Sequence, residues 1–459
     1  MTDTAITSVT MGVVADGESS GPQRVVRVAT PSGRTLSASA ARRVRLATPY
    51  NTRRGRESRS GLFTAWCREH GRIATDPGTV PDYVAYLADR GHQPETLETY
   101  AGTLAHGLAL SGHPLDAEDR SYISAIVNHR ASELAADPEG AGDALQAPEC
   151  TREDLAAMLA TLDRTSIVGK RDACALTLDW YMAGRSCEPG ALAVYDVVEE
   201  VAEVVDKETG ELLQLPALVV TVRRSKTNAH GRTKDRVRIV AQDDETCPVA
   251  AWRDWRAVLT AAEVAVGPLL RRVKNNKITT AGRPPRDPAR AGGIGERTIR
   301  NLIHRTAAAA GLVRELDPDE RKLLSTAAEA ADLAALADER VKAAREAARA
   351  AGLTAEEQNA ACTRAGLTAE EREAFAAERR RRRRLLRKSW RRYSGHSMRR
   401  GHVRHLQRIG TPRHIIEAQC RYVPGSKALA RYLDERVPWA ENPTVAMRRQ
   451  ARRPSPGGA

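Results

Sequence analysis

Five residues along the chain have side chains that could together break a phosphodiester bond: Arg185, Lys226, His396, Arg399 and Tyr432. Without a metal ion, this reaction needs a nucleophile, cations around the negatively charged transition state and an acid for the departing oxygen. A tyrosine hydroxyl can attack, arginines can hold phosphate oxygens, and lysine or histidine can carry a proton. The residue types therefore predict phosphoryl transfer to a protein side chain, with neither metal nor cofactor.

The first two candidates lie in short local patterns. Arg185 follows an apolar helical stretch, and Glu188 comes three residues later, where one helical face would bring the two side chains together. Taken alone, such a pair is usually a surface ion pair. Lys226 lies in the segment Arg224–Asn228 at the end of a predicted strand, where a hairpin turn would project it outward. Taken alone, it is an ordinary turn lysine.

His396 and Arg399 lie one helical turn apart, so both could reach a single phosphate group. The alternative is a basic helix face, which is favoured by His402, Arg404 and His405 further along. Both interpretations stay open on this pattern alone.

Taken together, these residues resemble the tyrosine recombinase family, also called phage integrases. In that family the catalytic residues come in the order Arg, Lys, His-x-x-Arg, His or Trp, and Tyr. The segment Thr246–Trp252 is also similar to the one that follows the family's hairpin. The resemblance points to Tyr432 as the nucleophile and excludes Tyr393, which precedes His396. It aligns Tyr422 with the His or Trp position, where a tyrosine can also donate a hydrogen bond to phosphate.

The resemblance implies that Tyr432 attacks the scissile phosphate and forms a 3′-phosphotyrosyl bond. A 5′ hydroxyl would then resolve this bond, so ATP is not required. Arg185 and Arg399 would clamp the phosphate, Lys226 would be the general acid and His396 would assist the nucleophile. The expected protein is an integrase or transposase of a mobile element. It would act on specific double-stranded DNA sites as a homotetramer, with accessory DNA-bending or directionality proteins.

Two other functions fit the same residues. A type IB topoisomerase or a hairpin-forming resolvase would reseal the original or the opposite strand. A DNA-binding regulator with a decayed site would only bind, and Tyr422 in place of His or Trp keeps that alternative open.

Composition favours a polyanionic partner. The 459 residues carry a formal net charge of +14, and clustered lysine and arginine release counterions when they meet phosphates. Nucleic acid is the first expectation and an anionic membrane surface the second. No stretch reaches the roughly 18 apolar residues of a spanning helix, and no apolar signal sequence is present. We therefore expect a cytoplasmic, nucleoid-associated protein that has no membrane partner. Its seven scattered cysteines suggest neither a disulfide framework nor a zinc site.

These patterns predict a mainly helical α+β fold in two domains. The composition of residues 1–50 predicts a disordered basic tail, and the apolar periodicity of 51–142 predicts a helical domain, which the family resemblance implies is the core DNA-binding domain. Residues 150–440 would form the catalytic domain, and 441–459 a C-terminal tail. The one clear β region of the catalytic domain, Val197–Val240, is broken twice by turn residues and predicts a small three-stranded antiparallel sheet.

Residues 315–388 form an insertion rich in Ala, Glu and Arg that is not part of the family's common core. A capping pattern at Asp317 predicts one long helix that stops at Gly352. The heptapeptide Ala351–Glu357 recurs as Ala365–Glu371, and each copy supplies a stop followed by a new capping box. Ten basic residues between Arg379 and Arg392 suit a phosphate backbone. A solvated arginine-rich helix or a partner-binding surface is the alternative.

Overall fold

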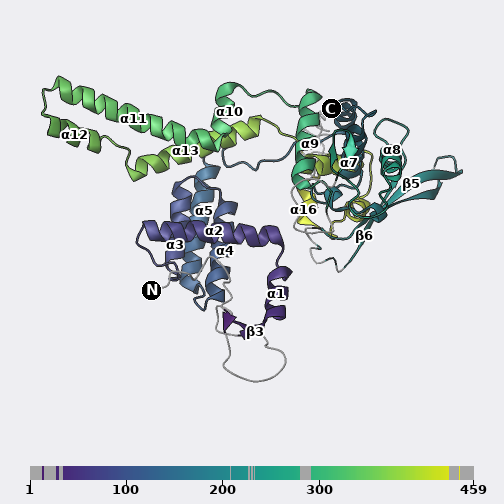
Figure 1. Ribbon diagram of the computed structural model, residues 1–459, viewed down its shortest axis with the longest axis horizontal. Helices are drawn as coiled ribbons and strands as arrows, with labels where there is room; N and C mark the ends of the chain where they lie inside the picture. The colour runs from purple at the N-terminus through teal and green to yellow at the C-terminus, as the bar shows by residue number, and fades with distance from the viewer. Residues whose placement is uncertain are drawn as a thin grey trace, which may run out of the picture. The chain divides into compact units, whose positions relative to one another are not determined.

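The computed structural model describes residues 35–206, 208–225, 228, 231, 233–279, 291–433 and 444, and the backbone alone at 13–14 and 27–29. By contacts, the chain divides into two compact units. The first comprises residues 1–145 and 316–390, and the second comprises 146–315 and 391–459. The fold is mainly helical with a small three-stranded antiparallel sheet, which confirms the predicted α+β class (Figure 1).

Four helices form the body of the first unit, as the apolar periodicity predicted. They are α2 (Tyr50–Glu69), α3 (Thr79–Asp89), α4 (Pro94–Leu110) and α5 (Ala117–Ala135). Their shared core holds the rings of Phe63, Trp66 and Tyr83 together with leucines and valines from α3, α4 and α5. Asp116 and Asp119 start α5 with a reciprocal capping box.

The segment before α2 differs from the predicted disordered tail. Helix α1 (Ala38–Ala47) begins where the Ser37 hydroxyl accepts a hydrogen bond from the Ala40 N–H, and it buries Ala41. Short strands β1 (Val13–Val14), β2 (Arg27–Ala29) and β3 (Thr35–Ser37) pair antiparallel ahead of it. Composition alone missed this local order, because a single N-cap and one buried alanine leave little trace in residue content.

The insertion is helical and belongs to the first unit by contacts. In the sequence, however, it lies between the two segments of the second unit. Its helices are α10 (Pro318–Leu324), α11 (Thr326–Ala350), α12 (Ala355–Arg364) and α13 (Ala369–Ser389). The predicted capping boxes at Asp317, Thr354 and Thr368 are all present. The prediction of a single long helix up to Gly352 is wrong. Ser325 ends α10 and its hydroxyl caps α11, so two helices stand in its place.

The sheet of the second unit has the order β4-β5-β6, with all neighbours antiparallel. Strands β4 (Val197–Val205) and β5 (Leu212–Val222) form a long hairpin, and β6 (Asp235–Val240) pairs only with the second half of β5. Alternate residues of β5 and β6, including Leu218, Val220 and Val237, enter the core.

Helix α7 (Ile167–Tyr181) is buried along almost its whole length, with Leu176, Leu178 and Trp180 inaccessible to solvent. Other elements of this unit are α6 (Arg152–Ala160), α8 (Pro248–Ala261), β7 (Val273–Lys274), β8 (Lys277–Ile278), α9 (Glu296–Ala309), α14 (Gly395–Arg408), α15 (Arg413–Gln419) and α16 (Lys427–Ala430). Short 3-10 turns span Pro189–Ala191 and Val194–Asp196. Helix α9 is followed by Gly311, whose φ is 70°.

Within the described ranges, no helix is both long and apolar enough to cross a membrane. None of the seven cysteines forms a disulfide, and five of them are buried.

Candidate active site

Arg185 lies in a tight turn just after α7 rather than on a helix. The Glu188 carboxylate accepts from the Arg185 backbone N–H at 3.0 Å through Oε2 and from Arg185 Nη1 at 3.0 Å through Oε1. The predicted pairing is therefore present, but a turn and not a helical face creates it. Glu188 is fully buried, while the Arg185 side chain keeps a fifth of its surface exposed. The Arg185 side chain can thus reach a ligand while the buried Glu188 carboxylate holds it in place.

The first turn of α14 is packed directly against this turn. A side-chain carbon added at Gly395 would lie 2.6 Å from Cβ of Ser186, so only glycine allows the approach. His396 and Arg399 follow on α14, one turn apart as predicted. His396 is exposed, whereas Arg399 points into the protein and is only 2% exposed.

Arg399 is held by three acceptors. Its Nε donates to the Tyr422 hydroxyl at 2.7 Å and its Nη2 to the Cys420 carbonyl at 2.7 Å, while Nη1 donates to the Ala183 carbonyl. A guanidinium has five N–H groups, so two remain for another acceptor. Arg399 therefore connects the segment just before Arg185 to the segment after α15.

Tyr432 meets His396 across 36 residues of sequence. Its hydroxyl lies 3.0 Å from His396 Nδ1, the distance of a hydrogen bond. Tyr432 lies in the turn that follows α16 rather than in the helix itself. Tyr432 is partly buried and its ring lies beside that of Tyr422, with centroids 6.2 Å apart. Of the candidate residues, the described structure brings Arg185, His396, Arg399, Tyr422 and Tyr432 together.

Tyr422 links Arg399 to Tyr432. The Arg399 guanidinium lies over the Tyr422 ring, 4.3 Å from its centroid, and the Tyr422 hydroxyl accepts a hydrogen bond from the same side chain. Burial raises the pKa of Tyr422, so its hydroxyl keeps its proton at neutral pH. That proton can be donated to a phosphate oxygen.

Lys226 lies outside the described residues. The flanking residues form the expected turn: the Asn228 N–H donates to the Ser225 hydroxyl at 3.1 Å, and the Asn228 side chain donates to the Thr233 carbonyl at 2.6 Å. This turn joins β5 to β6.

Two functional candidates escaped the sequence analysis. Arg421 reaches the buried Glu188 carboxylate at 2.7 Å, and Asp179 is completely buried at the end of α7 beside Gly184. Arg421 has a backbone φ of 59°, a conformation typical of glycine. A buried charge shows no periodicity of its own, so neither residue had a sequence signal.

His402 does not belong to a basic face on α14. That ring is 5% exposed and packs edge-on against Trp180 with centroids 4.7 Å apart. Burial lowers the pKa of His402 to about 3, so the ring is neutral. Tyr393, the tyrosine excluded as nucleophile, is also buried, and its hydroxyl donates to Asp154 at 3.1 Å.

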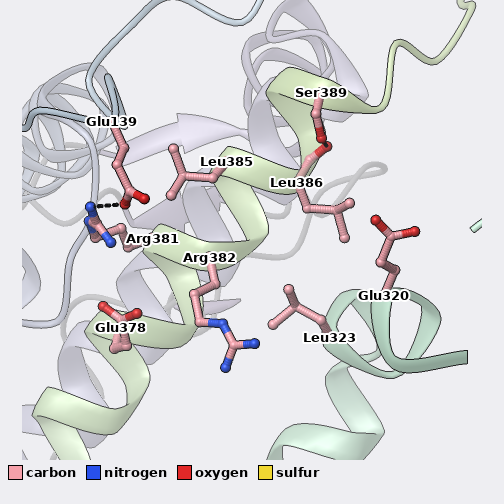
Figure 2. Close-up of a pocket in the computed structure, with 9 residues that line it drawn as sticks. All are labelled: Glu139, Glu320, Leu323, Glu378, Arg381, Arg382, Leu385, Leu386 and Ser389. Carbon is pink, nitrogen blue, oxygen red and sulfur yellow. Dashed lines mark hydrogen bonds and ion pairs between the residues drawn. The ribbon is translucent and has the colours of Figure 1, made fainter. Parts of the chain in front are cut away.

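The basic run on α13 is mostly engaged within its own unit. Six of its members bind carboxylates or backbone carbonyls there: Arg379, Arg380, Arg381, Arg383, Arg384 and Lys388. Figure 2 shows Arg381 bound to Glu139 at the edge of a cavity of about 500 Å³. This cavity has an apolar side formed by Leu323, Leu385 and Leu386, and its lining includes none of the candidate catalytic residues.

The arrangement offers a hydroxyl nucleophile beside an imidazole, and two guanidinium groups with N–H donors to spare. Among the described residues, no three His, Cys, Asp or Glu side chains are grouped so as to hold a metal ion. Compared with known proteins, the sequence matches no protein-family model and no curated protein.

Proposed function

We propose that this protein is a site-specific DNA recombinase that cuts and rejoins duplex DNA through a 3′-phosphotyrosyl intermediate. The observation that carries the proposal is the 3.0 Å contact between His396 Nδ1 and the Tyr432 hydroxyl. This contact pairs a base with a nucleophile, and Arg399 and Tyr422 adjoin the pair. The order of these residues along the chain, which resembles that of tyrosine recombinases, supports the same reaction.

The proposed first step transfers a phosphoryl group to Tyr432. An unperturbed tyrosine with a pKa near 10 lies about 4 kcal/mol from its ionised form at pH 7. His396 offsets part of this cost when its Nδ1 is unprotonated and accepts the phenolic proton. The phenolate oxygen then bonds to phosphorus as the bond to the 5′ oxygen breaks. The leaving oxygen takes a proton, for which Lys226 is the proposed donor.

The two arginines stabilise the charge that develops on the phosphate. Arg185 uses only Nη1 for its side-chain bond to Glu188, and no other partner of its guanidinium occurs in the described part of the chain. Arg399 has two N–H groups to spare, and Tyr422 can donate its hydroxyl proton. Loss of one such donor should cost on the order of 3 kcal/mol in the barrier.

The proposed substrate is double-stranded DNA that carries specific recombination sites, and the working form is a homotetramer on two duplexes. The net charge of +14 supports a polyanionic partner. The second step has the reverse chemistry of the first: a 5′ hydroxyl from the partner duplex attacks the phosphorus of the phosphotyrosyl bond and frees Tyr432.

A covalent trapping experiment tests the proposal. The protein is incubated with nicked duplexes from the DNA that flanks its own gene, and SDS-resistant protein–DNA adducts are counted. We expect an adduct with the wild type and none with Tyr432→Phe, because only Tyr432 supplies the nucleophilic oxygen. Tyr195→Phe is the matched control, because this tyrosine is 58% exposed in the same unit. It should form adduct at the wild-type rate.

The remaining outcomes separate the alternative functions. Tight binding with no adduct would favour the DNA-binding regulator. A protein that forms the adduct and relaxes supercoiled DNA but never exchanges strands between duplexes would favour a topoisomerase. An adduct that survives in Tyr432→Phe would contradict the assigned nucleophile.

A further inference from the structure

Arg421 is a third arginine beside the candidate site, and its charge is almost wholly enclosed. Its side chain is 6% exposed. Nη2 binds Glu188 Oε2 at 2.7 Å and also donates to the Met182 carbonyl at 3.2 Å. Its Nε and Nη1 are buried and have no hydrogen-bond partner among the described residues.

The backbone at this position does not favour arginine. Its φ of 59° lies in the left-handed region, which glycine adopts without a steric cost and a long side chain does not. Buried donors without acceptors add a further cost to stability. A strained backbone and unmatched donors together indicate that the Arg421 side chain has a function.

Glu188 connects Arg421 to Arg185. Arg185 Nη1 binds Oε1 of this carboxylate, and Arg421 Nη2 binds Oε2. Because the Arg185 backbone N–H also donates to Oε2, the carboxylate is fixed from both sides. Burial by itself raises the pKa of Glu188, but the charge of Arg421 and the bonds from Arg185 outweigh it and hold that pKa below its ordinary value.

We propose that Arg421 is a positioning residue for Arg185 and that it acts through Glu188. By fixing Oε2, Arg421 leaves Oε1 as the single acceptor for the Arg185 guanidinium. Nε and Nη2 of Arg185 are then presented to the substrate phosphate. This inference rests on the proposed recombinase function, because the scissile phosphate is the ligand that Arg185 would meet.

Single-turnover cleavage of a nicked duplex tests the role of Arg421. Arg421→Gly removes the guanidinium and suits the backbone, so we expect a folded protein. Its affinity for the duplex should stay within about twofold, and its cleavage rate should fall about tenfold because Arg185 is misplaced. Arg421→Lys keeps a charge that can reach Glu188 and should recover part of the rate. Arg421→Gly that cleaves at the wild-type rate would overturn the proposal.

A double variant tests the route through Glu188. Glu188→Gln should slow cleavage to a similar extent, and the double variant Arg421→Gly/Glu188→Gln should be no slower than the slower single variant. This variant removes both charges, so it also covers the case in which the glycine variant alone fails to fold. Rate losses that multiply would show that Arg421 acts without Glu188.

A measurement without DNA separates this inference from the proposed function. If the wild-type protein forms no adduct with any duplex, the recombinase proposal fails. Thermal unfolding of Arg185→Gln, Arg421→Gly and Arg185→Gln/Arg421→Gly then decides whether the two arginines are coupled. The shift of the unfolding midpoint in Arg185→Gln/Arg421→Gly should differ from the sum of the shifts in the two single variants, because both arginines share Glu188. Additive shifts would overturn the positioning role.

Discussion

Asp179 is the most unusual titratable side chain near the site. It is fully buried, and neither carboxyl oxygen has a hydrogen-bond partner in the described structure. Burial raises its pKa to about 8, and the negative charge of Glu188 adds to the effect, while Arg399 and Arg421 oppose it. The folded protein therefore keeps this carboxyl protonated at neutral pH. An unfolded chain would release the proton above about pH 4.

This difference makes stability depend on pH. Between about pH 4 and 8 the folded state holds a proton that the unfolded state has lost, so the contribution of Asp179 to stability falls as the pH rises. The slope is at most about 1.4 kcal/mol per pH unit for one proton. Asp179→Asn has no such proton, so its free energy of unfolding should decline less between pH 5 and 8.

Denaturant unfolding of both proteins across that range measures the effect. Asp206→Asn is the control, because backbone hydrogen bonds from Thr209 and Glu208 lower the pKa of Asp206 and put its titration at more acid pH. Its slope should equal that of the wild type. Equal slopes for the wild type and Asp179→Asn would contradict a protonated carboxyl at position 179.

At the scale of elements, α13 uses its arginines to join helices. Arg383 donates to the Leu323 carbonyl at 2.6 Å and to the Ser325 carbonyl at 2.8 Å, where α10 ends and α11 begins. Arg379 also donates to the Ser325 carbonyl and forms an ion pair with Asp332 on α11. Carbonyls at a helix end lack partners within the helix, so these side chains satisfy them.

We expect Arg379→Gln to destabilise the first unit by about 1–3 kcal/mol, because it leaves Asp332 and the carbonyls at the helix ends with fewer partners. Arg382→Gln is the matched control on the same helix, since Arg382 is exposed and should change stability by less than about 0.5 kcal/mol. Thermal unfolding measures both. A larger loss from Arg382→Gln would contradict the structural role of this arginine face.

At the scale of the whole molecule, the net charge of +14 favours the nucleic-acid partner that we propose. Because six of the ten basic residues of the α13 region are engaged inside the first unit, we expect other arginines to contact the proposed DNA. Helix α1 carries Arg42, Arg43 and Arg45, and all three are exposed. Phosphate contacts by such residues supply affinity that falls with salt.

The proposed reaction exchanges strands between two duplexes, so it needs four nucleophiles. We expect light scattering of the protein with full-site DNA to give a complex of four 50.0 kDa chains on two duplexes. Tyr432→Phe should assemble equally well, because it removes one oxygen and no charge. A strictly one-to-one complex on a full site would contradict the tetramer and favour the regulator.

The sequence by itself determined the local structure. Helix starts at Asp317, Thr354 and Thr368 were predictable because a capping box is made by residues three apart. The three strands were predictable from β-branched runs between turn residues. The order of Arg185, His396, Arg399 and Tyr432 was also visible, because each stands in a short pattern.

Only the tertiary structure decided which groups meet and which are buried. The contacts of Tyr432 with His396, of Arg421 with Glu188, and of Arg381 with Asp137 join residues 36, 233 and 244 positions apart. Short patterns carry no information on such pairs. Burial likewise depends on every element that covers a side chain, so Arg399 and His402 look like surface residues in sequence and lie inside the fold. The insertion joined the first unit for the same reason: long-range packing, not chain order, placed its helices.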